Sequence, residues 1–317
     1  MHGKSSIIPH RKDTRLTDPL TAPLTALWDA LWDALWDALW DALWDALWDA
    51  LWDALWDALW NGGLQMNLEQ EQVQRLHYDR IAHEYEAHYD DLCSQRYRDI
   101  FFHRPMFEGM NLSGMKVIEA MCGSGQTTQY LTSQGAQVTG LDISEEAIRS
   151  FNKRWPGLRS VCASILDSGL DSDSFDAVSI VGGLHHLHPY LNSAINEIHR
   201  ILRPGGYLCF VEPHKGSFPD LIRRRWYKYD SLFADNEEAI DLKAMKRKFA
   251  SQFIFNRERY SGNAAYLLVL NSMVFRIPLR LKPFYTPPLL RLESLICPLQ
   301  GEIFSCFVVC QWRKTSG

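Results

Sequence analysis

The sequence has 317 residues, of which 46% are hydrophobic and 22% charged, and a formal net charge of −5. This composition is ordinary for a folded globular protein, and the length suits one large domain or two small ones. The negative charge is concentrated in residues 26–61, which contain eight aspartates and no cation. The rest is nearly neutral, which gives no reason to expect a nucleic-acid partner.

Neither a targeting segment nor a metal site is evident. The seven cysteines are scattered, without a CxxC pair or a zinc spacing, so we expect no metal and a reducing, cytoplasmic environment. Residues 1–13 are polar and lack the apolar stretch of a signal peptide. No uncharged apolar run reaches the roughly 20 residues of a spanning helix.

Residues 26–61 are nine tandem tetrapeptides, eight of Ala-Leu-Trp-Asp and one of Ala-Leu-Trp-Asn. On a helix a period of four drifts by about 40° per repeat, so leucine and tryptophan form no single apolar face. One interpretation is a tryptophan-rich stalk for a membrane surface or for oligomerisation. The identity of the copies favours the other, a translated short-period expansion without a function. We therefore predict a low-complexity, non-functional extension over residues 1–65 and a functional domain over 66–317, with Met66 a candidate start.

From Met66 onward the pattern changes to that of a folded domain. Residues 67–91 have apolar and aromatic side chains at helical spacing, and an alternation of strands and helices follows. Such an alternation predicts a parallel, doubly wound α/β sheet, in which ligands bind at the carboxyl ends of the strands. The first five predicted strands are 115–121, 136–141, 159–163, 175–181 and 207–211, and the predicted helices cover 126–133, the residues behind the N-cap Ser144, and 190–202.

The strongest motif is the stretch Val117 to Gly125, which reads VIEAMCGSG. Glycines at 123 and 125 suit a backbone that a ligand approaches closely, and the amide end of the next helix points to the same place. Asp142 ends the next strand, 17 residues after Gly125. A carboxylate there suits hydrogen bonds from the hydroxyls of a ribose.

A nicotinamide-dependent oxidoreductase of the Rossmann type also uses such glycines and a later acid. The residues here depart from its fingerprint, because Glu119 precedes the glycines and Thr128 stands where the third glycine would fall. Two further stretches also favour a different family. They are Ser174 to Leu187, with SFDAVS and LHHL at its ends, and Ile201 to Leu208, which reads ILRPGGYL.

With these motifs in this order, residues 78–213 resemble the class I S-adenosylmethionine-dependent methyltransferases. The resemblance is greatest to the group that includes the ubiquinone and menaquinone C-methyltransferases and many small-molecule methyltransferases. It implies a Rossmann-like, doubly wound sheet of seven strands, the last two (253–260 and 304–312) forming an antiparallel pair. It also implies methyl transfer from S-adenosylmethionine, with a catalytically inactive cofactor-binding scaffold as an alternative.

The same resemblance implies roles for particular residues. Glu119 and the loop of Gly123 and Gly125 would hold the methionine end of the cofactor, and Asp142 the ribose. Around the adenine the resemblance implies Ile143, Ser164 and Ile165, and over the cofactor an aromatic lid of Tyr78 and Tyr85. Ser164 is a departure, since the family has an aspartate there; a hydroxyl accepts the adenine amine more weakly, and Asp167 is a nearby substitute.

Candidate catalytic residues follow the fourth and fifth strands. A neutral imidazole of His185 or His186 can take a proton from an acceptor, and Glu212 lies at the equivalent point of the next strand. His188 and His214 are near neighbours of these residues. Packing is the alternative for each side chain, and a metal site is not expected because the histidines lack nearby acidic partners.

Residues 215–317 are where we expect the choice of acceptor to reside. Arg223 to Tyr229 is basic and aromatic, which suits either a solvated helix face or an anionic acceptor. Residues 264–300 are an apolar insertion with basic residues between the apolar ones. We expect a small apolar or amphiphilic acceptor, no nucleic acid, and peripheral membrane contact through 264–300. Packing on the sheet or on a second subunit is the alternative, and the sequence leaves the acceptor and the oligomeric state open.

Overall fold

A computed structural model describes residues 89–227, 238–272 and 277–316. The chain divides into two compact units, Met1–Leu68 and Glu69–Gly317. The Ala-Leu-Trp-Asp repeat and the expected lid tyrosines, Tyr78 and Tyr85, lie outside the described residues. The predicted boundary at residue 65 therefore stays a prediction.

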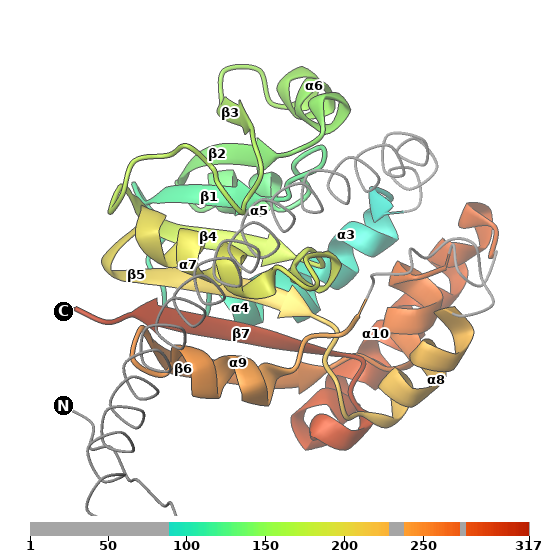
Figure 1. Cartoon of the computed structure of the whole chain (residues 1–317). Coiled ribbons are helices and arrows are strands. Elements are labelled where there is room, and N and C mark those ends of the chain that lie inside the picture. Colours follow the sequence, from blue (N-terminus) through green and yellow to red (C-terminus); the bar gives the residue numbers. More distant parts are fainter. Residues whose placement is uncertain (1–88, 228–237, 273–276, 317) are drawn as a thin grey trace, which may run out of the picture. The chain divides into compact units, whose positions relative to one another are not determined.

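A seven-stranded sheet forms the centre of the second unit, with the strand order β3-β2-β1-β4-β5-β7-β6 (Figure 1). The pairs β1–β2, β1–β4, β2–β3 and β4–β5 are parallel, while β7 is antiparallel to both β5 and β6. The predicted doubly wound sheet with antiparallel last strands is thus confirmed. The strands are β1 (Lys116–Ala120), β2 (Gln137–Asp142), β3 (Arg159–Cys162), β4 (Phe175–Val181), β5 (Leu202–Glu212), β6 (Phe253–Ser261) and β7 (Phe307–Lys314).

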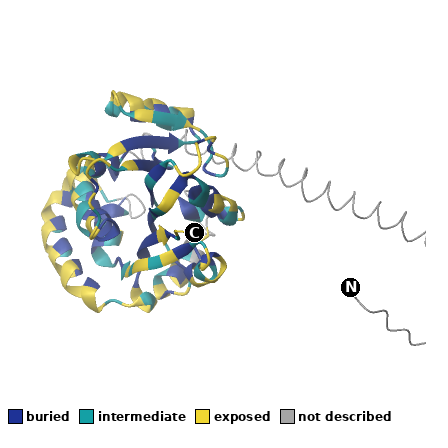
Figure 2. Cartoon of the chain, turned by 90° about the vertical axis from the view of Figure 1, so that its left-hand side faces the viewer, coloured by how far each residue is buried: buried dark blue, intermediate teal, exposed yellow. Residues whose placement is uncertain are grey.

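Helices cover both faces of this sheet, so the central strands are buried on both sides, as their continuous apolar runs require. Figure 2 shows buried strands in the middle and helices whose outer sides are exposed. One core joins the sheet to α7 (Leu191–Ile201) and α9 (Leu242–Phe249). The other joins it to the π-helices η2 (Asp99–His103) and η4 (Tyr266–Leu270) and to α3 (Leu92–Arg98), α4 (Arg104–Met106), α5 (Thr128–Ser133) and α10 (Lys282–Ile296).

Residues 204–206, which precede the predicted strand 207–211, lie inside a strand. Leu202 pairs with Phe175 and Tyr207 pairs with Ala177, so residues 203–206 bulge out of β5 between these two pairs. Gly205 has a φ of +77°, a conformation that glycine adopts without strain. The Pro-Gly-Gly sequence therefore accommodates extra residues within the strand, where we had expected it to precede one.

The apolar insertion of residues 264–300 folds as η4, η5 (Leu279–Leu281), α10 and η6 (Cys297–Leu299). One side of it packs into the second core through Val269, Leu270 and Leu290, and α10 contacts α3. Within the described ranges, no helix has the length and apolar character that crossing a membrane requires.

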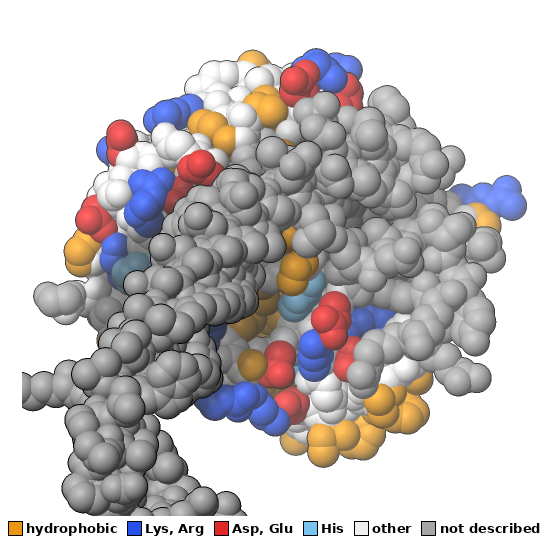
Figure 3. All heavy atoms as spheres, in the orientation of Figure 1, with side chains coloured by type: hydrophobic (Ala, Val, Ile, Leu, Met, Phe, Trp, Pro, Cys, Tyr) orange, Lys and Arg blue, Asp and Glu red, His pale blue; other side chains and the backbone are white. Residues whose placement is uncertain are grey.

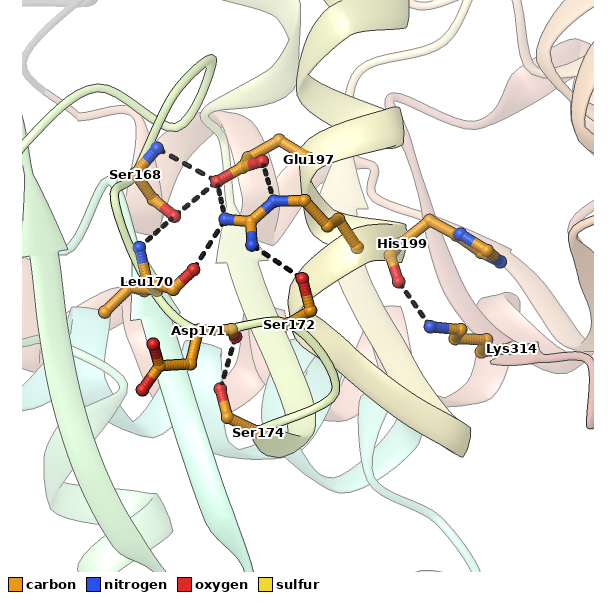
Figure 4. A network of polar contacts seen from close by, with 9 residues as sticks. Ser168, Leu170, Asp171, Ser172, Ser174, Glu197, His199 and Lys314 are labelled. Carbon is orange, nitrogen blue, oxygen red and sulfur yellow. Dashed lines mark hydrogen bonds and ion pairs between the residues drawn. The ribbon is translucent and has the colours of Figure 1, made fainter.

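The loop between β3 and β4 is held to α7 by a polar network (Figure 4). Glu197 Oε1 accepts hydrogen bonds from the backbone N–H of Ser168 (3.0 Å) and from its hydroxyl (2.5 Å). Arg200 bridges the same carboxylate to the Leu170 carbonyl, 2.6 Å from Nη2, and to the Ser172 hydroxyl, 2.9 Å from Nη1. This network fixes the loop that contains Ser164 and Ile165.

Candidate functional site

The glycine loop leaves the end of β1 and meets the end of β2. Gly123 has a φ of +53°, and a side chain there would find no atom within 4 Å. Its N–H donates to Asp142 Oδ2 at 2.9 Å, and Asp142 Oδ1 accepts the Ser144 N–H at 2.9 Å. Ser144 caps the following helix, α6 (Glu145–Arg154), as predicted, by accepting the Ala147 N–H. Asp142 therefore joins the two loops and lies beside open space at Gly123.

Glu119, in β1, holds the residues that follow the glycine loop through hydrogen bonds. Its carboxylate accepts the Thr127 N–H at 2.8 Å and the Thr128 hydroxyl. Burial raises the pKa of Glu119, against the opposing effect of the two threonines and of Arg98. The amide end of the helix after this loop was expected to face a ligand, but the Thr127 N–H is bonded to Glu119. Helix α5 begins at Thr128, two residues later than predicted.

Gly125 is required for a reason that the sequence does not show. Its φ is +81°, and a side chain there would come within 2.4 Å of Nε1 of Trp155 and 2.9 Å of Phe151. Trp155 donates from that nitrogen to the carbonyls of Ser124 (3.1 Å) and Gly125 (3.2 Å). Trp155 could not be predicted as part of this site, since nothing near it in the sequence indicates a contact with residues 30 positions away.

Met121 follows β1 with a φ of +54°, which costs a non-glycine residue about 1 kcal/mol or more. Its side chain lies against the turn after β4, because a side chain added to Gly183 would come within 2.6 Å of the Met121 sulfur. Gly183 therefore allows the thioether to lie between the ends of β1 and β4.

The residues expected around the adenine lie on neighbouring loops. Ile143 is half-buried after β2, and Ile165 is buried in the first core. The Ser164 hydroxyl accepts the Leu166 N–H at 3.1 Å, and Ser164 forms an isolated bridge with Asp167. The Asp167 side chain is exposed.

A second group of polar side chains lies at the ends of β4 and β5. Glu212 is fully buried, and its Oε1 accepts the N–H groups of Gly183 and Leu184, both at 2.7 Å. Its Oε2 lies 2.7 Å from Nδ1 of His185 and accepts the His185 N–H at 3.3 Å. Glu212 thus holds both the turn after β4 and the imidazole that follows it.

Burial governs the charge of this pair. It raises the pKa of Glu212 to about 7, although the backbone donors oppose the shift. It lowers the pKa of His185 to about 3, so the ring is neutral at pH 7. No described residue is hydrogen-bonded to Nε2 of His185, and 13% of the side chain is exposed. The arrangement suits a neutral imidazole that donates from Nδ1 and can accept at Nε2.

Other side chains surround this pair. The His186 ring stacks on that of His185, with centroids 3.8 Å apart. His214 Nε2 lies 2.7 Å from the Ser305 hydroxyl. Arg223, in α8 (Phe218–Tyr227), pairs with buried Asp220 at 2.5 Å. Among the residues that the structure describes, no three metal-ligating side chains form a group that could hold an ion.

The comparisons with known proteins agree with this geometry. Residues 118–210 match the family described as methyltransferase domain. An uncharacterized methyltransferase of Synechocystis sp. is 36% identical over 118 residues, which cover 37% of this chain and 56% of that protein. The phthiotriol/phenolphthiotriol dimycocerosates methyltransferase of Mycobacterium leprae is 35% identical over 115 residues, which cover 35% of this chain and 42% of that protein. The chain thus spans about half the length of the curated relatives it matches.

A solved structure shows the same fold. It is a methyltransferase of Thermotoga maritima, described as a possible histamine N-methyltransferase. The TM-score is 0.50 at 18% identity, and the match covers 75% of this chain and 99% of that one. At this identity the likeness concerns the fold alone.

Proposed function

We propose that this chain, which belongs to the class I S-adenosylmethionine-dependent methyltransferases through residues 118–210, transfers a methyl group from S-adenosylmethionine to a small acceptor. The observation that carries the proposal is the junction of Gly123 and Asp142 at the ends of β1 and β2. There a carboxylate holds a loop with open space beside it. Open space at a backbone turn, with an acid at the next strand, fits a nucleoside-containing cofactor.

In the proposal, different residues at this edge of the sheet contact different parts of the cofactor. Asp142 accepts from the ribose hydroxyls, and Gly123 allows close approach. Glu119 acts on the methionine end, while Ile143, Ser164 and Ile165 border the adenine. Tyr78 and Tyr85 remain proposed lid residues.

The bound cofactor supplies an electrophilic methyl carbon, so the protein mainly positions the acceptor, excludes water and receives a proton. We assign the proton to Nε2 of His185. The Glu212 carboxylate, 2.7 Å from Nδ1, would offset the charge of the imidazolium against the burial that lowers the pKa of this ring. When bound, S-adenosylmethionine would supply the methyl group to the acceptor, and the proton that the acceptor loses would pass to Nε2 of His185. Glu212 is a positioning residue, because its oxygens already receive three backbone N–H groups and Nδ1 of His185. His186, stacked on His185, restricts the rotation of its ring.

The acceptor in this proposal is apolar or amphiphilic. A relative of this chain is named for phthiotriol and phenolphthiotriol dimycocerosates, which supports this choice. The apolar insertion of residues 264–300 supports it as well, with peripheral contact between this insertion and a membrane. A nicotinamide-dependent reaction and an inactive scaffold are the alternatives that the test below separates.

Calorimetry on the full chain tests the cofactor. We expect binding of S-adenosylmethionine or S-adenosylhomocysteine at micromolar concentration and none of NAD. Asp142→Ala should weaken binding at least tenfold, about 1.4 kcal/mol, through the loss of charge-assisted hydrogen bonds. Asp171→Ala is the matched control, since Asp171 is exposed in the loop before β4. Binding of NAD alone would favour an oxidoreductase, and cofactor binding without methylation of any acceptor in a broad screen would favour a scaffold.

A further inference from the structure

Helix α10 buries polar side chains and exposes apolar ones, which is the reverse of the usual arrangement in a surface helix. Its buried face carries two charged residues and a threonine, whereas its outer face is apolar. The buried residues recur at helical spacing as Lys282, Thr286, Leu290 and Glu293, with Cys297 just beyond the helix. The outer face follows the same spacing, two residues later: Phe284 (81% exposed), Pro288, Leu292 (47%), Leu295 (74%) and Leu299 (88%).

The buried face is fixed by hydrogen bonds near both ends of the helix. Lys282 is 1% exposed, and its Nζ lies 2.6 Å from Asp91 Oδ2 and 2.9 Å from the Ser94 hydroxyl. Three turns later, Glu293 accepts the Tyr97 hydroxyl at 2.5 Å and the N–H groups of Ala265 and Tyr266. Rotating α10 to bury its leucines would break all of these bonds and expose the charges, so the apolar face cannot turn inward.

The apolar surface continues beyond α10. The short helix η7 (Glu302–Phe304) exposes Ile303 and Phe304, and it packs beside α8, which exposes Phe218, Leu221 and Ile222. In Figure 3 hydrophobic side chains gather at the lower edge of the face shown, close to where Figure 1 draws α8. Soluble monomers rarely leave contiguous apolar patches of this extent to water.

The charges beside the outer face of α10 are cations, whereas Glu302, in η7, is paired with Lys243. Between residues 277 and 301 the exposed charged residues are Arg280 and Arg291, and the single acid, Glu293, is buried. Apolar side chains next to arginines without exposed acids match a surface that is apolar inside and anionic outside, as a leaflet with acidic headgroups is. In a two-fold dimer through α10, each arginine would face the cations of the second copy, which disfavours that occupant.

We propose that the outer face of α10, with Leu299 and η7, is a docking surface for an anionic lipid membrane. Phe284, Leu292, Leu295 and Leu299 enter the interface between headgroups and acyl chains, and Arg280 and Arg291 contact the phosphates. The surface rests on the proposed function only in that an amphiphilic acceptor would be reached from the membrane. The docking itself needs neither cofactor nor acceptor.

Vesicle flotation of the full chain tests the proposal. We expect the wild type to float with vesicles of phosphatidylglycerol and phosphatidylcholine and to remain unbound with phosphatidylcholine alone. Leu295→Ser with Leu299→Ser should weaken vesicle binding at least tenfold, since two exposed leucines lose their apolar contact. Arg280→Gln with Arg291→Gln should weaken it several-fold and reduce its dependence on salt. The matched control is Ile254→Ser, because Ile254 is 54% exposed on β6, outside this surface.

Three results would overturn the docking surface. One is a wild type that never floats. Another is a double leucine variant that floats as well as the wild type. The two proteins share the amino-terminal extension, so this result would place the membrane contact outside the substituted leucines. The last is a wild-type dimer that the leucine substitutions dissociate, which would assign the surface to a second copy. Calorimetry with S-adenosylmethionine on the same variants keeps the proposals separate, since docking can fail while cofactor binding persists, and the reverse.

Discussion

Residues 78–213, here called the cofactor half because the cofactor is proposed to bind there, and the carboxy-terminal third of the chain both place a glutamate in a buried position where it accepts backbone N–H groups. In the cofactor half the partners are near in sequence: Glu119 and Thr127 are 8 residues apart, and Asp142 and Gly123 are 19 apart. In the last third they are distant. Glu293 and Tyr97 are 196 residues apart, and Lys282 and Asp91 are 191 apart.

This difference explains what a sequence can reveal. A contact within one strand–loop–helix unit repeats in a fixed order, so the residues that make it form a motif. A contact between α3 and α10 joins two segments whose spacing nothing local restricts, and so it leaves no motif. From the sequence alone, Lys282 and Glu293 are expected to be solvated charges on an apolar insertion. Only the fold shows that α3 lies beside them and that both are buried.

The largest effect should come from breaking the distant contact. In Glu293→Ala the Tyr97 hydroxyl and two backbone N–H groups lose their acceptor inside the core. At about 1–3 kcal/mol for each buried donor left unsatisfied, partly relieved by relaxation, we expect unfolding free energy to fall by about 3–5 kcal/mol. Urea unfolding followed by circular dichroism measures this. Ser294→Ala, on the neighbouring exposed residue, is the control, and an equal loss in both variants would refute the anchoring role.

His103 is a buried side chain whose Nε2, unlike the Glu293 carboxylate, has no hydrogen-bond partner among the described residues. The residue is 3% exposed, and burial, followed by the charge of Arg98, lowers its pKa to about 3. In the unfolded chain this histidine has an ordinary pKa of about 6.5, so below that pH it binds a proton that the folded protein does not bind. Stability from this residue is therefore complete above pH 6.5 and is lost as the pH falls toward 3.

We expect His103 to account for about 2–3 kcal/mol of the stability lost between pH 7 and 4.5. The measurement is the urea midpoint as a function of pH for the wild type and for His103→Gln. The variant should have the shallower acid slope, whatever its stability at pH 7. Curves that run parallel over this range would show that His103 titrates normally.

The contact between Glu119 and Thr127, which are close in sequence, can be tested without disturbing the fold. Glu119→Gln keeps an acceptor for Thr127 but removes the negative charge that we assign to the methionine end of the cofactor. We expect S-adenosylmethionine affinity to fall about tenfold, or 1.4 kcal/mol, with little change in stability. Glu293→Gln is the matched substitution in the other region and should leave affinity unchanged. Equal affinities for both variants would remove Glu119 from the cofactor site.

The smallest effect concerns Trp155. Trp155→Phe keeps a ring against Gly125 but loses the N–H that donates to the carbonyls of Ser124 and Gly125. We expect a loss of about 1 kcal/mol, seen as a several-fold weaker cofactor affinity by calorimetry. An effect on thermal stability alone, with unchanged affinity, would show that the indole supports the helix and not the glycine loop.

The sheet was predicted well from the sequence because apolar runs, glycines and caps are local signals. The strand β4 was predicted to the residue, and Ser144 was identified as a cap. The bulge of residues 203–206 within β5 was not predicted, since a Pro-Gly-Gly turn and a Pro-Gly-Gly bulge have the same composition. At the site, Asp142 and Gly123 were found together, while Trp155 and the Met121–Gly183 contact were missed because they depend on how separate loops approach one another.

The position of β7 has a consequence for how the protein is made. This strand lies between β5 and β6, yet residues 307–314 are synthesised after both of its neighbours. At about 5–20 residues per second, several seconds separate the appearance of β6 from that of β7, and through this interval the nascent chain carries two bare strand edges. Only when Lys314 reaches Asp173 and the carbonyls of His199 and Leu202 is the sheet locked to the loop before β4 and to α7. Figure 4 shows the contact of Lys314 with the His199 carbonyl. The nascent chain is thus most exposed to aggregation, and most dependent on chaperones, just before this strand is added.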